Sequence, residues 1–324
     1  MNDVLAIGNA LVDVLATVTD EQMDELGIVK NSYELVDAEM ADSLYAAMPP
    51  AVEISGGAAA NTAVGVVSMG GSAAYIGRVY DDQLGGVFAH DLRATGVDFE
   101  CPLAGDGPPT GRALTLITPD ANRTFRTYLG AANCLGPDDI DERVVADAEV
   151  TYLEGYLWDP PDAKDAFRKA MKLARESGRR VSLTLSDPFC VQNWGGEFAE
   201  LLERGQIDIL FANEAELLTL YPGTFETAIE RIRSTCPLAA ITRGEHGAVI
   251  VSGSETHEVA AAPVDDVVDT TGAGDLYAAG FLFGLTHGEP LARCGELGSL
   301  CAAEVISHVG ARPQRSLAEL VASS

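Results

Sequence analysis

The segment from Asp269 to Asp275 reads DTTGAGD and directly precedes the apolar run LYAAGFLFGL. Glycines let a backbone turn several N–H groups toward one point, and at the start of a helix these donors and the helix dipole favour an anion. Gly272, Ala273 and Gly274 would then form an oxyanion pocket. Asp275, in the first helical turn, would accept a proton from a substrate hydroxyl that attacks a phosphorus atom held there. A glycine turn followed by an aspartate that complements the helix dipole is the simpler structural alternative.

The widespread phosphate-binding motifs are absent from the sequence. No lysine follows a glycine, so the P-loop pattern Gly-x-x-x-x-Gly-Lys does not occur, and no Gly-x-Gly-x-x-Gly follows a β-like run. Phosphate binding therefore requires another arrangement, and DTTGAGD supplies one.

Composition and charge exclude several classes of protein. The 49 acidic and 21 basic side chains give a net charge of −28, which repels a polyanion, so we expect no nucleic-acid partner. No run of 18 apolar residues occurs and the first residues lack a basic leader, so we expect no membrane association and a cytoplasmic location. The six cysteines are scattered, which indicates neither a zinc site nor a disulfide framework.

Six short apolar runs bounded by Gly, Asp or Asn are typical of buried parallel strands. They are residues 4–8, 73–77, 150–155, 181–185, 208–212 and 238–242. Helix-like segments lie between them, among them residues 83–96, with apolar side chains three or four positions apart, and residues 160–178, which begin with proline and end with glycine. The alternation predicts an α/β fold with a doubly wound, mostly parallel sheet flanked by helices, and ligands at the carboxyl ends of its strands.

Two regions, residues 13–50 and 101–129, interrupt this alternation. They are rich in β-branched and aromatic residues, and RALTLIT, PDAN and RTFRTYL in succession predict a β-hairpin with its turn. We expect the two regions to form a small, discontinuous β lid over the substrate site. Residues 1–12, 51–100 and 130–324 would then form the α/β core, with the nucleotide site.

DTTGAGD resembles the C-terminal signature of the ribokinase family, the PfkB carbohydrate and nucleoside kinases, and the resemblance extends in order over nearly the whole chain. It implies a ribokinase-like fold, with Asp275 as the catalytic base and Gly272, Ala273 and Gly274 as the anion hole. Asp269 and Thr271 match residues associated with a monovalent cation, which would be K⁺.

The amino-terminal half contains two further motifs that look like those of the same family. GNALVD, residues 8–13, matches a strand-end motif whose Asn9 and Asp13 would lie near the sugar. SGGAAAN, residues 55–61, supplies Gly56, Gly57 and Asn61. Asp13 and Asn61 can hold paired ribose hydroxyls as acceptor and donor, and the glycines allow a close approach of the backbone. Structural alternatives are a turn for Asp13 and a polar group at a helix start for Asn61.

Three later segments resemble the nucleotide-binding parts of the family, which implies ATP and Mg²⁺ as cofactors. NEAE matches an Asn-x-x-Glu motif linked to magnesium and phosphate, with Glu216 acting indirectly on the metal; Asn followed three residues later by Glu is also a helix capping box. TRGEHGA resembles the turn at the nucleotide, and HVGARP the segment on its adenine side. The predicted ATP-binding residues are Asn213, Glu216, Thr242, Gly244, Gly247, Gly310 and Ala311.

The substrate is indicated by GNALVD, LEGYLW and LSDPF, which look most like the adenosine kinase branch of the family. Tyr156 and Phe189 then match aromatic residues around the purine, a flat ring that stacks well on such side chains. Core packing is the structural alternative for both. The sequence departs from the branch at Ala10, Tyr80 and Asp187, and the carboxylate of Asp187 could favour another ring or a sugar amine.

The sequence therefore predicts an ATP-dependent kinase that phosphorylates the 5′-hydroxyl of a nucleoside, converting adenosine to AMP. A kinase for a free sugar such as ribose or fructose is the alternative, since it would share every phosphate-handling residue. A non-enzymatic binding protein is disfavoured because Asp275 and the glycines are present. We expect a small-molecule nucleoside or sugar as the partner, and a monomer or homodimer.

Overall fold

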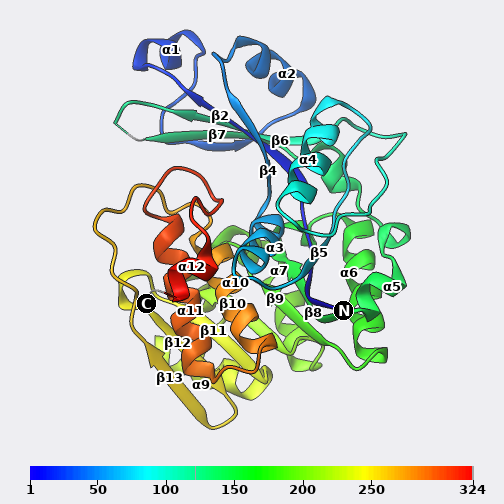
Figure 1. The fold of residues 1–324 in the computed structure, drawn as a ribbon, viewed down its shortest axis with the longest axis vertical. Coiled ribbons are helices and arrows are strands. Elements are labelled where there is room, and N and C mark those ends of the chain that lie inside the picture. Colours follow the sequence, from blue (N-terminus) through cyan, green and yellow to red (C-terminus); the bar gives the residue numbers. More distant parts are fainter. Residues whose placement is uncertain (121, 323–324) are drawn as a thin grey trace.

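The structure, a computed structural model, describes residues 1–120 and 122–322, which form two sheets (Figure 1). The larger sheet has eight strands in the order β13, β12, β11, β10, β9, β8, β1, β5. Their bounds are β1 Asn2–Ile7, β5 Ala73–Ile76, β8 Ala148–Glu154, β9 Arg180–Thr184, β10 Ile209–Asn213, β11 Leu238–Thr242, β12 Ala248–Ser252 and β13 Glu255–Val259.

The six predicted buried strands are confirmed as β1, β5, β8, β9, β10 and β11, and neighbours among them pair in parallel. β12 and β13 extend the sheet with antiparallel pairs and were not predicted. Most side chains of the parallel strands are buried on both faces, which explains why their sequences are continuously apolar rather than alternating.

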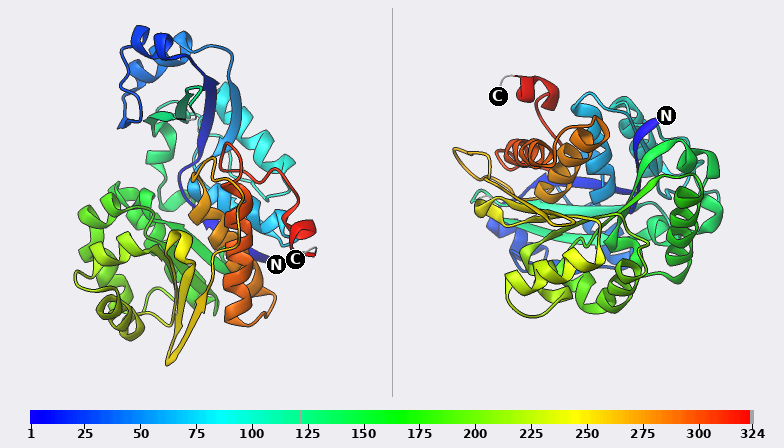
Figure 2. Two further views of the ribbon diagram at one scale, coloured as in Figure 1. Left: turned by 90° about the vertical axis from the view of Figure 1, so that its left-hand side faces the viewer. Right: turned by 90° about the horizontal axis from the view of Figure 1, so that it is seen from below.

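Helices cover both faces of this sheet, as the right-hand view of Figure 2 shows. Val4 and Ala6 of β1 face one core and Leu5 and Ile7 the other. The first core includes α3 (Ala58–Ser68), α4 (Gln83–Ala94), α10 (Ala273–Thr286), α11 (Leu291–Val305) and α12 (Leu317–Ala322). The second includes α5 (Glu142–Ala146), α6 (Pro161–Glu176), α7 (Pro188–Glu203), α8 (Glu214–Leu220) and α9 (Phe225–Thr235). The doubly wound α/β class is thus confirmed.

The second sheet has five strands in the order β3, β7, β6, β2, β4 and stands at one end of the molecule (Figure 1; Figure 2, left). Its strands are β2 Leu11–Thr17, β3 Tyr33–Leu35, β4 Val52–Gly56, β6 Gly111–Ile117 and β7 Arg123–Tyr128. The antiparallel β6–β7 pair confirms the predicted hairpin, although its turn contains Ala121, which lies outside the described residues. β4 pairs with β2 and so belongs to this sheet, whereas the sequence placed residues 51–100 in the core.

Residues 13–50 also contain two helices, although the sequence predicted only strands there. They are α1 (Asp20–Glu25) and α2 (Ala38–Ala47). Thr19 and Gln22 form a capping box at the start of α1, and the Asp37 side chain accepts a bond from Met40 N at the start of α2. The capping residues were a readable signal for both helices.

Short 3₁₀ helices connect several elements: η1 Gly130–Cys134, η2 Pro137–Asp139, η3 Gly155–Trp158 and η4 Gly244–His246. In the part of the chain that the structure describes, all six cysteines are free, and four of them are buried. None of the helices described is long and apolar enough to cross a membrane.

Candidate active site

The predicted site residues gather at the carboxyl ends of the parallel strands. The chain proceeds from β1 to β5 on one side and to β8, β9 and β10 on the other, so the strand order reverses between β1 and β8. Such a reversal leaves a crevice in which α/β proteins bind ligands. Asn9 follows β1 and Glu154 ends β8, and the Asn9 side chain donates a hydrogen bond of 2.8 Å to Glu154.

The DTTGAGD segment forms the turn and the first residues of α10. Gly272 is the N-cap with a φ of 79°, a conformation that other residues rarely adopt. A Cβ on Gly272 would also lie 2.8 Å from the Cβ of Ala311, so the C-terminal segment packs directly against this turn. Around Gly274, by contrast, a Cβ would meet no atom within 4 Å. The start of α10 is therefore open to a ligand beside Gly274.

Asp275 lies in the first turn of α10, as predicted, and contacts α3. The side-chain amide of Asn61 donates a hydrogen bond of 2.9 Å to Asp275 Oδ2, and Thr62 Oγ1 donates to its backbone oxygen at 3.2 Å. Desolvation raises the pKa of Asp275 to about 6; the Asn61 bond and the Arg312 charge lower it, and Asp13 raises it. At neutral pH this carboxylate is therefore ionised, and its pKa is close enough to 7 for it to accept a proton.

Asp13, Gly56 and Gly57 form the neighbouring part of the site, on the five-stranded sheet and the start of α3. A Cβ on Gly56 would overlap the Asp13 carboxylate, and one on Gly57, whose φ is 97°, would overlap the backbone oxygen of Asn9. Desolvation raises the pKa of Asp13 to about 6, and the charge of Arg312 opposes that rise. The glycines thus allow Asp13 and Asn9 to approach the same loop.

Glu154 is a buried carboxylate that the sequence analysis missed. It accepts hydrogen bonds from Asn9 Nδ2 at 2.8 Å, from Asn9 N at 3.3 Å and from Ala59 N at 2.8 Å. Desolvation raises its pKa to about 7, although these donors lower it. The bond to Glu154 fixes the Asn9 amide so that its Oδ1 is buried without a partner among the described residues, as is Asn61 Oδ1. A ligand with hydroxyl groups would satisfy both oxygens.

Tyr156 lies in η3, directly after β8, and Phe189 lies in the first turn of α7, after the neighbouring strand β9; the two residues are 41% and 66% exposed. The Tyr156 hydroxyl donates to the backbone oxygen of Ser186, which has a φ of 72°. Asp187 is the N-cap of α7 and accepts a 2.6 Å bond from Cys190 N. Core packing, the structural alternative for the two aromatic residues, does not apply to side chains so exposed.

Arg123, at the start of β7, was also missed and reaches the DTTGAGD turn from the five-stranded sheet. It forms a buried ion pair with Asp269. Asp269 also accepts bonds from Thr271 N, Thr271 Oγ1 and Gly310 N at 2.7–3.0 Å. The resemblance implied a monovalent cation near Asp269, but in the structure this carboxylate pairs with the guanidinium of Arg123. The second terminal nitrogen of Arg123, Nη2, is buried without a partner among the described residues.

Five of the seven predicted nucleotide residues lie at the ends of β10 and β11, whereas Gly310 and Ala311 pack against the DTTGAGD turn. Asn213 and Glu216 form a capping box at the start of α8, and desolvation raises the pKa of the buried Glu216 to about 7. Thr242 pairs in register with Asn213. Gly244 and Gly247 have φ values of 57° and 81° in the following turn. In the part of the chain that the structure describes, no hydrogen bond joins these five residues to Asp275, so they form a separate part of the same edge.

The side chains that the structure describes do not by themselves form a metal site. Residues 1–120 and 122–322 contain no cluster of three or more His, Cys, Asp or Glu side chains that could hold a metal ion. A magnesium ion at this site would depend on phosphate oxygens and water for most of its ligands, as is common for Mg²⁺ in phosphoryl-transfer enzymes.

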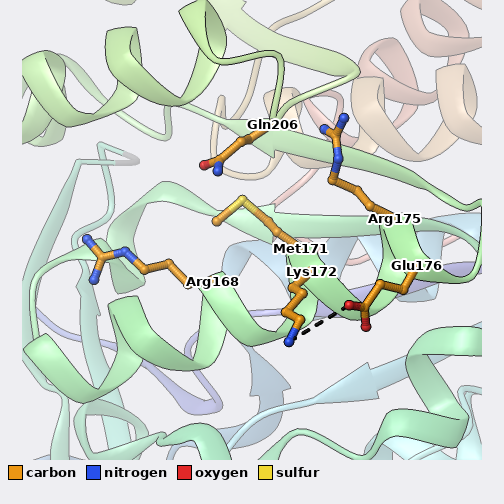
Figure 3. A pocket seen from close by; sticks show the side chains of 6 residues that line it. All are labelled: Arg168, Met171, Lys172, Arg175, Glu176 and Gln206. Atoms are coloured by element: carbon orange, nitrogen blue, oxygen red, sulfur yellow. Dashed lines mark ion pairs between the residues drawn. The ribbon is translucent and has the colours of Figure 1, made fainter.

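A separate hollow lies on the outer surface of α6, where Lys172 and Glu176 form an ion pair of 3.8 Å (Figure 3). None of the predicted site residues lines it. Its lining consists of Arg168, Met171, Lys172, Arg175, Glu176 and Gln206.

Comparison with known proteins agrees with this geometry. Residues 3–317 match the pfkB family carbohydrate kinase profile. An adenosine kinase from Saccharomyces cerevisiae is 32% identical over 94% of this chain and 95% of its own length. The solved structure of an adenosine kinase from Sinorhizobium meliloti is 51% identical, with a TM-score of 0.91 and 99% of both chains covered. A "probable sugar kinase protein" from Rhizobium etli CFN 42 is 50% identical, with a TM-score of 0.92, covering 99% of this chain and 98% of that one.

Proposed function

The chain belongs to the pfkB family of carbohydrate kinases, and from this premise we propose that it transfers a phosphoryl group from ATP to the 5′-hydroxyl of a nucleoside, adenosine in particular. The family, the ribokinase-like fold and a phosphotransferase activity with an alcohol acceptor agree with the sequence predictions. One observation carries the choice of a nucleoside: Tyr156 and Phe189 follow the adjacent strands β8 and β9, and both residues are exposed there.

In the proposed reaction Asp275 accepts the proton of the 5′-hydroxyl while the hydroxyl oxygen attacks the γ-phosphorus. The bond between that phosphorus and the bridging oxygen breaks, and ADP leaves with the electron pair. The backbone N–H groups of Gly272 and Gly274, at the start of α10, would stabilise charge on the transferred group, whereas Ala273 N donates to the backbone oxygen of Thr270 at 3.2 Å. The unpartnered Nη2 of Arg123 would add a positive charge on the same side.

The sugar would be held by groups of complementary type. Asp13 offers a carboxylate acceptor to a pair of ribose hydroxyls. The unpartnered oxygens of Asn9 and Asn61 accept further hydroxyl donors, and Glu154 and Asp275 hold the amides in that orientation. These contacts favour a substrate rich in hydroxyl groups and would position its reacting oxygen near Asp275.

We propose ATP as the donor, bound along the ends of β10 and β11 and against the C-terminal segment. Gly244, Gly247, Gly310 and Ala311 would contact the nucleotide, together with Thr242. A bound Mg²⁺ would neutralise part of the phosphate charge, and Asn213 and Glu216 would orient its water ligands. A potassium requirement has little support from Asp269, since its carboxylate already accepts four donors.

The five-stranded sheet with α1 and α2 is proposed to act as a lid over the substrate. Asp13 belongs to it, and Arg123 connects it to the DTTGAGD turn. Closure would exclude water, which would otherwise compete with the nucleoside for the phosphoryl group. The lid then comprises β2, β3, β4, β6 and β7 rather than residues 13–50 and 101–129 alone.

A kinase for a free sugar remains the second candidate, favoured by the name of the similar Rhizobium etli protein. The deciding experiment measures kcat/KM for adenosine, guanosine, inosine, ribose and fructose with Mg-ATP, in the parent and in Phe189→Ala. If the ring stacks on a base, its loss should raise KM for the nucleoside roughly 5- to 150-fold and leave KM for ATP unchanged.

The matched control is Lys172→Ala, which removes another long side chain, 73% exposed, from the outer surface of α6, away from the predicted site residues. It should leave both Michaelis constants at the parent values. A parent enzyme that prefers ribose or fructose, or a Phe189→Ala variant that weakens sugar and nucleoside equally, would replace the nucleoside proposal with the sugar kinase.

A further inference from the structure

Arg312 makes an unusual set of contacts for a residue that the proposed reaction does not use. Its Nε and Nη2 donate to the backbone oxygen of Ser55 at 3.0 and 2.7 Å, and Nη2 donates to Ser55 Oγ at 3.0 Å. Nη1 donates to the backbone oxygen of Ala60 at 2.8 Å. All three guanidinium nitrogens are thus engaged by a single segment of the amino-terminal half.

The contacts of Arg312 connect the two sides of the candidate site. On one side it directly follows Gly310 and Ala311, which pack against Asp269 and Gly272. On the other side Ser55 and Ala60 flank the loop that contains Gly56 and Gly57.

Ser55 is itself fixed from behind. Its N and Oγ donate to Asp91 Oδ2 of α4 at 2.9 and 2.6 Å. Asp91 and Arg312 thus hold Ser55 from two sides, which fixes the substrate loop relative to the DTTGAGD turn.

The charge of Arg312 is also placed among carboxylates. Desolvation lowers the pKa of Arg312. The negative charges of Asp13, Asp91 and Asp275 oppose this effect and raise the pKa. Six residues interact with the Asp275 carboxylate through charge or a hydrogen bond: Asp13, Asn61, Tyr152, Glu154, Tyr156 and Arg312. Within that set Arg312 is the single cation, and it favours the ionised form of both Asp13 and Asp275.

We propose that Arg312 is a positioning residue for phosphoryl transfer, which holds the Ser55–Ala60 loop against the nucleotide side and supplies the positive charge that Asp13 and Asp275 face. The inference rests on the proposed function, because it takes Asp275 as the base and Asp13 as a substrate ligand. It adds a residue that acts through these groups without touching the reacting atoms.

Two variants separate the charge of Arg312 from its hydrogen bonds. Arg312→Gln removes the charge and keeps donors, whereas Arg312→Lys keeps the charge but cannot reach both carbonyl oxygens with a planar group. The matched control is Arg179→Met. Arg179 is also partly buried and donates to a backbone oxygen, that of Ala146 at 3.2 Å, but at the amino-terminal edge of the strands.

Two measurements are made from pH 5 to 9. One is kcat/KM for the preferred alcohol substrate with Mg-ATP. The other is the Kd of that substrate without ATP, measured by calorimetry, which does not depend on turnover.

In Arg312→Gln we expect the acidic limb of both profiles to move to higher pH by roughly one unit or more, since an arginine typically lowers a neighbouring carboxyl pKa by about that amount. In Arg312→Lys the limb should stay near the parent position, while substrate binding weakens roughly tenfold through lost hydrogen bonds. Arg179→Met should match the parent in both profiles.

Coincident acidic limbs in Arg312→Gln and the parent would refute the charge role. Parent-like substrate affinity in Arg312→Lys would refute the positioning role, and that variant decides if Arg312→Gln does not fold. Failure of this inference is distinct from failure of the proposed function. An active Asp275→Asn enzyme would remove the assigned base, whereas the ATP-free binding profile tests Arg312 whatever the identity of the base.

Discussion

The carboxylate of Asp275 experiences opposing influences from its neighbours. Desolvation raises its pKa to about 6, whereas the amide of Asn61 and the guanidinium of Arg312 favour the ionised form. A carboxylate with this pKa is ionised at neutral pH and still basic enough to assist removal of a hydroxyl proton. The location of this carboxylate therefore suits a general base.

Replacement of Asp275 by Asn should lower kcat by about 10²- to 10⁴-fold, because the proton acceptor is lost while shape is kept. Nucleotide affinity should be unchanged. Steady-state kinetics at pH 8 give kcat and the KM for ATP, and thermal unfolding at the same pH checks that the variant is folded. The control is Asp106→Asn, which removes a carboxylate 95% exposed on its side chain and should behave as the parent. Turnover near the parent value in Asp275→Asn would mean that another group accepts the proton.

The residues that could be predicted from sequence are those whose neighbours in the chain already define a local structure. Gly272 and Asp275 belong to one turn, and Asn213 and Glu216 to one capping box. Arg123, Glu154 and Arg312 could not be found in this way. Their partners lie 146, 145 and 257 positions away, so only the folded chain brings them together.

At the scale of elements, the start of α3 depends on the backbone of Gly57. Replacement by Ala places a Cβ at the backbone oxygen of Asn9 in a conformation with positive φ. Gly57→Ala should therefore destabilise the protein by roughly 1–3 kcal/mol and raise KM for the alcohol substrate, since Asn9 and Asn61 move apart. Urea unfolding and steady-state kinetics provide the two readouts.

The matched control for Gly57 is Gly86→Ala within α4, where a Cβ meets no atom within 4 Å. That variant should be as stable as the parent or more stable by about 0.5–1 kcal/mol, because Gly is a poor helix former. Equal effects of the two substitutions would show that the conformation at Gly57 is not required.

The elements were predictable to different degrees for a physical reason. The parallel strands of the core are buried on both faces, so each is a continuous apolar run. The residues of β4 were predicted to belong to the core, and only the pairing of β4 with β2 places them in the other sheet. α1 and α2 are short, and the capping residues at their starts were not used in the prediction.

At the scale of the whole molecule, desolvated carboxylates are concentrated at one edge of the large sheet. Desolvation raises the pKa of Glu154 and Glu216 to about 7, and that of Asp13 and Asp275 to about 6. The folded protein thus binds these protons more tightly than the unfolded chain does. The stability they contribute is fully present below about pH 4 and is lost as the pH rises through 6 to 7. The proposed reaction uses the ionised forms of Asp13 and Asp275, so we expect activity and this part of the stability to change in opposite directions with pH.

We therefore expect kcat/KM to rise between pH 5 and 8 with an apparent pKa near 6. The free energy of unfolding of Asp275→Asn, relative to the parent, should increase by roughly 1–3 kcal/mol over the same range, because only the parent retains a carboxylate that must ionise away from water. Urea unfolding of both proteins at pH 5 and pH 8 gives this difference. A difference that does not change with pH would contradict the raised pKa of Asp275.

The contact between Arg312 and Ser55 also sets an order of events during synthesis. The two residues are 257 positions apart in the chain. At a translation rate of about 5–20 residues per second, roughly 13–50 s pass between the synthesis of one and of the other. Throughout that interval the nascent chain carries Asp13 and the Gly56–Gly57 loop without their cationic neighbour. On the role proposed for Arg312, the candidate site is therefore complete only after this residue has been synthesised.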